Sequence, residues 1–171
     1  MGFCLFGSVA VAVRFAQREL GVGRVAVLDW DVHHGNGTEE IFRDDDSVLF
    51  ASLHQWPFYP GSGGPGEGDA TTVNVPLPAG TTDDHFLTAF ETKVEPALRA
   101  FEPELVVVSA GYDAAATDPI GGMDLTPKCF AELGRRVPSL APRSALVLEG
   151  GYDVEALPGL VEATLDGLAT G

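Results

Sequence analysis

Residues 24–37 read Arg-Val-Ala-Val-Leu-Asp-Trp-Asp-Val-His-His-Gly-Asn-Gly, and this stretch carries most of the information about fold and site. Its first part, residues 25–28, is a short β-branched and aliphatic run, which is typical of a strand buried on both faces of a parallel sheet. Polar residues then follow at every second position, at Asp29, Asp31 and His33. If the backbone stays extended, alternation puts these three side chains on one side of the strand. The other side then carries Trp30, Val32 and His34.

Two carboxylates and an imidazole at the carboxyl end of a strand predict a divalent metal site. Oxygen and nitrogen donors suit zinc, iron(II) or manganese better than copper(I). The alternative is a polar loop capped by its own Asp and Asn side chains, and for an isolated Asp-x-Asp pair we would prefer it. Because a histidine stands at the next alternate position and glycines end the segment, we favour the metal site. A catalytic site of this kind needs one more protein ligand from elsewhere in the chain.

Aliphatic strands alternate with helical segments along the rest of the chain. We expect further strands at residues 47–53, 104–109 and 144–148, a short extended piece at residues 73–77, and helices at residues 5–20, 39–42, 83–101, 126–137 and 154–168. The first helix is apolar around most of its circumference, so it is expected to be largely buried. Asp83 is expected to cap the third helix, Pro96 to interrupt it, and Pro158 to make the last helix irregular. The class is α/β, with three layers and a mainly parallel sheet flanked by helices.

In sheets of this kind, ligands bind beyond the carboxyl ends of the strands. Asp113 follows the strand at residues 104–109 and is the natural third ligand, although it could instead cap a turn. Two Asp and one His with an open position would hold a metal that polarises a carbonyl and lowers the pKa of its bound water. Tyr152, after two glycines, sits where a phenol could donate a hydrogen bond to a developing oxyanion. Its alternative role is an aromatic anchor packed over the sheet.

Residues 54–72 form a long loop that is rich in glycine and proline and also contains three aromatic residues. A loop of this length in a compact domain is either functional or disordered. Disordered linkers are poor in aromatic residues, so Trp56, Phe58 and Tyr59 favour an ordered binding loop.

Composition fits one domain of 171 residues. Lys plus Arg number 10 and Asp plus Glu number 25, which gives a formal charge of −15. This charge argues against binding the phosphate backbone of nucleic acids and permits a cationic substrate, although acidity can also serve solubility alone. Cys4 and Cys129 are too few for a disulfide framework. No signal peptide and no apolar run of membrane-spanning length is recognisable, so no membrane partner and a cytoplasmic location are expected.

Several motifs together resemble the zinc-dependent histone deacetylase family, which includes bacterial acetylpolyamine amidohydrolases and acetoin-utilisation proteins. They are Asp-Trp-Asp-Val-His-His-Gly-Asn-Gly-Thr, Ser-Leu-His-Gln-Trp-Pro-Phe-Tyr-Pro-Gly-Ser-Gly, Ser-Ala-Gly-Tyr-Asp-Ala, Asp-Pro-Ile-Gly-Gly-Met and Leu-Glu-Gly-Gly-Tyr. The resemblance runs from Gly2 to about Gly159. It implies the arginase-like α/β fold, with residues 1–171 forming a partial deacetylase domain from which the N-terminal strands are missing.

The resemblance also implies roles for individual residues. The zinc ligands would be Asp31, His33 and Asp113, and Tyr152 would be the tyrosine that stabilises the transition state. A structural potassium ion would be bound by the side chains of Asp29 and Ser52 and by the backbone carbonyl of Leu53. The substrate would be contacted by Gly2, Phe3, Phe58, Tyr59 and Gly151. Asp118 matches an acidic position of the family near the site.

The activity implied is hydrolysis of N-acetyl amides, in acetyl-lysine or acetylpolyamines. The family's general base belongs to an adjacent histidine pair upstream of the position of Gly2, so we expect impaired turnover by this chain. No other histidine of the chain, at positions 34, 54 or 85, matches a catalytic position.

Two alternatives remain. One is a non-catalytic, metal-binding fragment of a truncated deacetylase gene, whose exposed sheet edge would favour association. The other is arginase-like hydrolysis on two manganese ions, which needs further Asp and His ligands. The segment at Asp113 reads Asp-Ala-Ala and offers no second alternating carboxylate, which disfavours that chemistry.

Overall fold

A computed structural model describes residues 3–171, so the expectation for Gly2 lies outside the described residues. The core of the molecule is a five-stranded sheet in the order β3-β2-β1-β4-β5. All neighbouring strands run parallel. The strands are β1 (Val25–Asp29), β2 (Val48–Gln55), β3 (Thr72–Leu77), β4 (Leu105–Ala110) and β5 (Ser144–Leu148). The predicted α/β class with a parallel sheet is confirmed.

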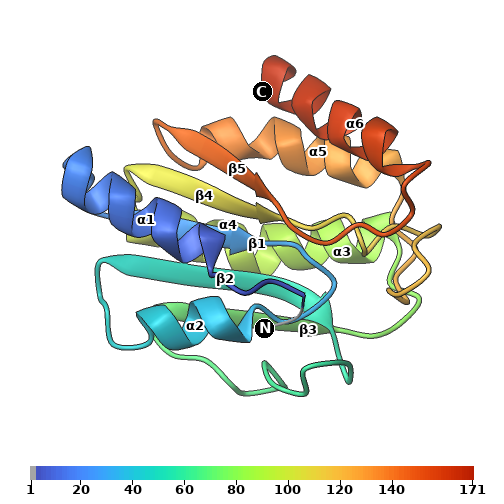
Figure 1. The fold of residues 1–171 in the computed structure, drawn as a ribbon, viewed down its shortest axis with the longest axis horizontal. Helices are drawn as coiled ribbons and strands as arrows, with labels where there is room; N and C mark the ends of the chain where they lie inside the picture. Colours follow the sequence, from blue (N-terminus) through green and yellow to red (C-terminus); the bar gives the residue numbers. More distant parts are fainter. Residues whose placement is uncertain (1–2) are drawn as a thin grey trace.

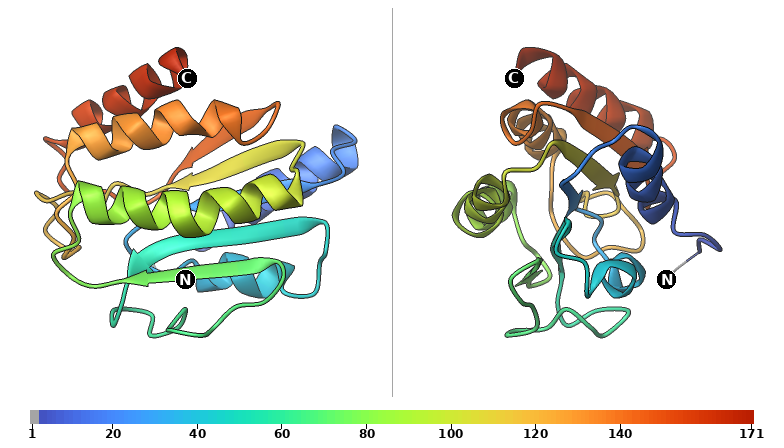
Figure 2. Two further views of the ribbon diagram at one scale, coloured as in Figure 1. Left: turned by 180° about the vertical axis from the view of Figure 1, so that it is seen from behind. Right: turned by 90° about the vertical axis from the view of Figure 1, so that its left-hand side faces the viewer.

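Helices cover both faces of the sheet (Figures 1 and 2). One face carries α1 (Ser8–Glu19) and α2 (Asn36–Phe42). The other carries α3 (Asp83–Ala89), the π-helical turn η1 (Phe90–Val94), α4 (Glu95–Phe101) and α5 (Pro127–Arg136), which is followed by the 3₁₀ turn η2 (Val137–Ser139). The last helix, α6 (Leu157–Thr170), packs on α5. No helix within residues 3–171 is long and apolar enough to cross a membrane.

Strand β1 contributes to two separate hydrophobic clusters because its side chains alternate between the faces. Val25 and Val27 pack with the buried residues of α1 and α2. Ala26 and Leu28 pack on the opposite face with the residues of α3, η1, α4 and α5. All five residues of β1 are buried, as the aliphatic run predicts for a central parallel strand.

The expectation that the first helix is largely buried is wrong. Only Val9, Ala10, Val13 and Ala16 of α1 are buried. Val11 and Phe15 on its outer side are 65% and 56% exposed. An apolar circumference indicates that a helix can be covered on both sides, but tertiary structure decides whether neighbours are present on both sides.

Two details of the other helices also differ from expectation. Thr82, not Asp83, is the N-terminal capping residue of α3, and the Asp83 carboxylate accepts a hydrogen bond from the Thr126 amide at 2.8 Å instead. Pro158 lies in the first turn of α6, where a missing N–H has no cost, so it does not disturb the helix. The interruption near Pro96 is confirmed: the π-helical turn η1 comes directly before it, because proline lacks an amide for regular helical bonding.

Helices α5 and α6 approach each other backbone to backbone at two glycines. A Cβ atom added at Gly134 would overlap the carbonyl oxygen of Thr164, and one at Gly167 would overlap that of Ala131. The close packing of this helix pair therefore depends on the absence of side chains at both positions.

We expect Gly167→Ala to lower the free energy of unfolding by about 1–3 kcal/mol, because a rigid backbone carbonyl has no room to retreat. Gly159→Ala is the matched control, since it lies in the same helix with no atom within 4 Å of an added Cβ. It should stabilise by about 0.4–1 kcal/mol through the unfolded chain. Urea denaturation of both variants measures the difference, and equal stabilities would contradict the packing described here.

Candidate metal centre

The candidate centre forms where two neighbouring strands end. Strands β1 and β4 pair in parallel, with Asp29 opposite Ser109. Asp31 and His33 lie two and four residues beyond the end of β1, and Asp113 lies three residues beyond the end of β4. The parallel register brings both loops to the same edge of the sheet.

One ligand atom each from Asp31, His33 and Asp113 lies within 4.8 Å of the other two. His33 Nδ1 is 3.0 Å from Asp31 Oδ1 and 3.1 Å from Asp113 Oδ2. Asp113 is fully buried, whereas the side chains of Asp31 and His33 are 15% and 22% exposed. The group is therefore anchored in the interior on one side and open to solvent on the other.

Backbone amides fix the two carboxylates. The amide of Val32 donates to Asp113 Oδ1 at 2.8 Å, which joins the β1 loop to the β4 loop. The amide of Gly150 donates to Asp31 Oδ2 at 3.0 Å, which adds the loop after β5. A Cβ atom on Gly150 would overlap Asp113 Oδ2 and would come within 2.6 Å of Asp31 Oδ2. Only glycine allows the backbone to approach both carboxylates this closely.

The two carboxylates create a strong preference for positive charge between them. Burial disfavours the charged form of His33, but its hydrogen bonds to Asp113 and Asp31 outweigh burial and raise the pKa of His33 to about 10. Burial raises the pKa of Asp113 to about 6, against the opposing effect of the hydrogen bond to His33. A cation in this position would be stabilised by the same two carboxylates.

The donor set fits a divalent metal ion. Two carboxylate oxygens and one imidazole nitrogen converge from two loops, and one side of the group is open. Three protein ligands with a free position are the arrangement of catalytic zinc sites, and oxygen and nitrogen donors also accept iron(II) or manganese.

Aromatic side chains surround the open side. Phe58 stacks on the His33 ring with a centroid distance of 5.2 Å, and Tyr59 meets the same ring edge-on at 6.2 Å. Phe3 packs edge-on against Tyr152 at 5.8 Å. Burial, reinforced by the charges of Asp113 and Asp31, raises the pKa of Tyr152 to about 12. Its phenol therefore keeps its proton at neutral pH.

The three residues expected at a monovalent cation site lie beside the metal group but do not join it. Asp29 and Ser52 are register partners on β1 and β2, and both are buried, as is Leu53. The Ser52 hydroxyl lies 2.9 Å from His54 Nδ1. Burial, with the charge of Asp31 adding to it, raises the pKa of Asp29 well above its usual range.

The other histidines occupy different surroundings. His34 points away from the metal group, and its ring nitrogens contact Ser62 at 2.8 Å and Glu39 at 2.9 Å. His54 Nε2 lies 2.8 Å from the carbonyl oxygen of Gly63, and His85 is exposed on α3. The sequence alone indicates no role for this buried network, which holds the far end of the aromatic loop. Its signal in the sequence is weak, because His54 lies within the otherwise apolar strand β2 but His34 and Ser62 lie in loops and Glu39 lies on α2.

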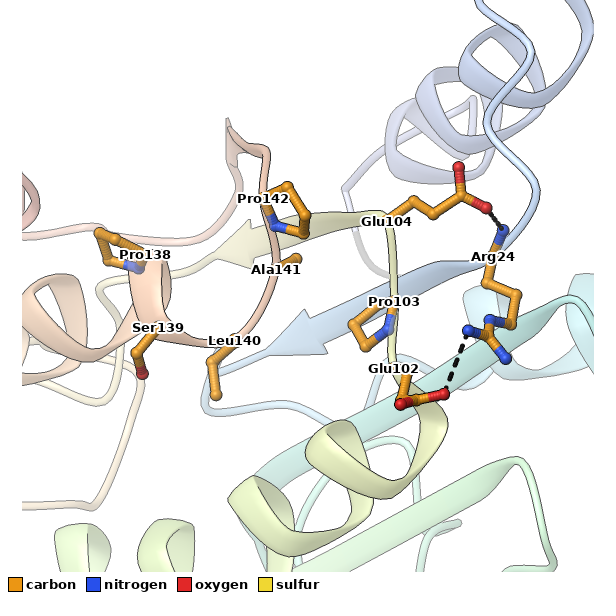
Figure 3. Close-up of a pocket in the computed structure, with 9 residues that line it drawn as sticks. All are labelled: Arg24, Glu102, Pro103, Glu104, Pro138, Ser139, Leu140, Ala141 and Pro142. Carbon is orange, nitrogen blue, oxygen red and sulfur yellow. Dashed lines mark hydrogen bonds and ion pairs between the residues drawn. The ribbon is translucent and has the colours of Figure 1, made fainter.

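A separate open hollow of about 550 Å³ lies at the opposite edge of the sheet (Figure 3). It is lined by residues that precede β4 and β5, and by Arg24, which precedes β1. Arg24 pairs there with Glu102 at 3.4 Å, and its amide donates to Glu104 at 3.3 Å. Because the hollow is at the amino ends of the strands, it is not part of the metal group.

Comparison with known proteins places these features in a family. The sequence profile of the histone deacetylase domain matches residues 1–168, nearly the whole chain. The chain belongs to the histone deacetylase family. Its sheet and flanking helices have the arginase/deacetylase fold of that family: the solved structure titled "Crystal Structure of HDA15 HD domain" superposes with a TM-score of 0.91 and 40% identity, over 100% of this chain and 52% of that one.

Similar members of the histone deacetylase family include a plant protein and an archaeal protein. Histone deacetylase 10, chloroplastic, of Oryza sativa subsp. japonica is 44% identical over 96% of this chain and 39% of its own length. A probable deacetylase of Archaeoglobus fulgidus is 45% identical over 92% of this chain and 46% of its own length. The chain thus spans less than half the length of these relatives.

We expect Gly150→Ala to disturb the candidate metal group directly. The added Cβ must push apart two carboxylates that backbone amides hold in place, which should cost about 1–3 kcal/mol of folding free energy. The same change should weaken binding of a divalent cation, measured by isothermal titration calorimetry with zinc chloride. Gly159→Ala, remote from the group, serves as the control, and unchanged zinc affinity in Gly150→Ala would argue against the site.

Proposed function

We propose that this chain forms the zinc-binding part of a deacetylase that hydrolyses N-acetyl amides. The observation that carries the proposal is the convergence of Asp31, His33 and Asp113 at the open edge of a histone deacetylase fold. Zinc, when bound by these three residues, would supply Lewis-acid activation of the amide carbonyl and of a water molecule.

Within this proposal, Tyr152 donates its phenolic hydrogen bond to the oxygen of the amide carbonyl as negative charge develops there. Its raised pKa supports the role, because only a protonated phenol can donate. Gly150 and Gly151 precede Tyr152 and leave the approach to the carbonyl free of side chains. Gly151 adopts a φ of 140°, which side chains rarely permit.

The proposed substrate is the aliphatic arm of an acetylated lysine or an acetylated polyamine. Phe58 and Tyr59 on one side and Phe3 on the other offer apolar surface beside His33 and Tyr152. Gly2 and Gly151 belong to the same proposed substrate-binding set. The net charge of −15 favours a positively charged polyamine or a basic protein tail.

In a polypeptide limited to residues 1–171, no histidine is available as the general base for the proton-transfer step. His33 is itself a member of the metal group. His34 and His54 belong to the buried network, and His85 lies on α3. A positioned base contributes roughly 10²–10⁴ in rate, so we propose slow turnover for this polypeptide alone. The alternative is a metal-binding fragment without turnover.

We further propose a potassium ion held by Asp29, Ser52 and the carbonyl of Leu53. The burial of the Asp29 carboxylate supports it, because a buried charge needs a partner.

The free thiols of Cys4 and Cys129 support a reducing compartment such as the cytoplasm. Strand β5 contains no charged residue and exposes Leu148, which supports association of chains through this sheet edge.

Zinc binding tests the first part of the proposal. Zinc at about 100 times its dissociation constant should raise the free energy of unfolding by about 2.7 kcal/mol, because it binds the folded chain alone. Asp113→Asn keeps the side-chain shape but removes a charged ligand, so most of this stabilisation should disappear. Asp153→Asn is the matched control, since that carboxylate lies outside the metal group, where it accepts from the amides of Glu155 and Ala156 and from the side chain of Thr117. Equal zinc stabilisation in both variants would contradict the assignment of Asp113.

Turnover tests the second part. With zinc and a fluorogenic acetyl-lysine substrate, Tyr152→Phe should lower kcat by roughly 10²–10³-fold while zinc affinity is retained, because one oxyanion donor is lost. Turnover unaffected by this change would refute the role of Tyr152. Stoichiometric zinc binding with no turnover in the unmodified chain would favour the non-catalytic alternative.

A further inference from the structure

The motif Asp118-Pro119-Ile120-Gly121-Gly122-Met123 links the metal group to Tyr152, although none of its side chains belongs to either. Asp118 is 8% exposed, and its carboxylate accepts three backbone amides. Oδ1 accepts from Ile120 at 2.8 Å and from Gly121 at 3.2 Å, both within the motif. Oδ2 accepts from the amide of Tyr152 at 2.7 Å, which lies in the loop after β5.

The motif itself is firmly attached to the metal group. The backbone of Gly121 lies against the carbonyl oxygen of Asp113 so closely that a Cβ atom there would overlap it. The amide of Gly122 donates to Gln55 Oε1 at 2.8 Å, and the amide of Gln55 donates to the carbonyl of Val32 at 2.9 Å. Asp118 is thereby fixed relative to both loops that supply the metal ligands.

The segment that carries Tyr152 needs such an anchor. Gly150 and Gly151 come directly before it, and glycines fix the backbone direction poorly. The ring of Tyr152 packs edge-on against Phe3, whose own side chain is 83% exposed and gives little support. A 2.7 Å hydrogen bond to a carboxylate is charge-assisted and stronger than one between neutral groups.

We propose that Asp118 is a positioning residue that sets the distance between the Tyr152 phenol and the metal group. It acts through the backbone amide of Tyr152 and touches no substrate. The role rests on the function proposed above for Tyr152. A misplacement of about 1 Å can cost 10²-fold in rate. The amide nitrogen of Tyr152 is two bonds from its Cβ atom, so loss of the bond to Asp118 should shift the phenol directly.

Tyrosine-selective ¹⁵N labelling tests this directly, because the chain has three tyrosines and should give three amide signals. In Asp118→Asn, the Tyr152 signal is expected to move and its amide exchange to accelerate at least tenfold, the factor that corresponds to loss of about 1.4 kcal/mol of hydrogen bonding. The signals of Tyr59 and Tyr112 should stay in place. Asp153→Asn, the matched control on the other side of Tyr152, should leave all three unchanged in exchange rate.

An unmoved Tyr152 signal in Asp118→Asn would overturn the proposal, and so would an equal acceleration of all three amides, which would indicate general loosening. If Asp118→Asn does not fold, the unmodified protein decides. Slow exchange of the Tyr152 amide, which lies outside any helix or strand, supports the bond to Asp118, and exchange at the rate of a free loop amide overturns it.

A kinetic double-mutant cycle separates this proposal from the proposed function. In the zinc-loaded protein, Asp118→Asn should lower kcat about tenfold or more with little change in KM, and it should have less than about a twofold effect when Tyr152 is already Phe. A Tyr152 signal that responds to Asp118→Asn without zinc binding would refute the proposed function and leave only the anchoring of the Tyr152 backbone by Asp118 intact. Normal zinc binding and a Tyr152→Phe effect, with an unresponsive Tyr152 signal, would refute the positioning role alone.

Discussion

The short contacts of His33 Nδ1 with the carboxylates of Asp31 and Asp113 are the interaction on which the site depends, since they join loops 80 residues apart in the chain. The contacts exist because β1 and β4 are parallel neighbours in register, so that both chains leave the sheet at one edge. A sheet slipped by one residue would reverse every side chain and separate the three groups. The hydrophobic alternation of β1, with Val27 on one face and Leu28 on the other, therefore positions the candidate metal ligands as well as the core.

Glycines allow the backbone to pack closely against Asp31 and Asp113. Gly111, Gly121 and Gly150 each lie where a Cβ atom would overlap an oxygen atom of Asp31 or Asp113. The backbone at Gly111 and Gly150 thus lies against the two carboxylates, Gly121 lies against the backbone carbonyl of Asp113, and the amide of Gly150 is close enough to donate to the Asp31 carboxylate. Such close packing fixes the carboxylates before any cation arrives, which limits the entropy lost on binding.

Solvent exposure differs between this centre and the aromatic residues around it. Asp31, His33 and Asp113 directly follow the strands, whereas Phe3 and Tyr59 are mostly exposed side chains on irregular segments. The buried His34 and His54 network serves as a support between these two regions, because it ties Ser62 and Gly63 of the aromatic loop to the sheet.

The sequence by itself determined the strand pattern, the parallel α/β class, and Asp31, His33 and Asp113 as the candidate ligand set. Strands buried on two faces are aliphatic runs, and polar residues follow where they end, so both features can be read from the order of the residues. The sequence did not determine that the outer side of α1 is exposed, that Asp83 bonds a neighbouring loop, or that Asp118 holds the amide of Tyr152. Those outcomes depend on which segments meet in space. A carboxylate can accept a hydrogen bond from any of several amides, and the sequence does not show which amide it will bond. Local periodicity can be read from the order of the residues, whereas the hydrogen-bond partner of a polar side chain depends on which distant loops the tertiary structure brings together.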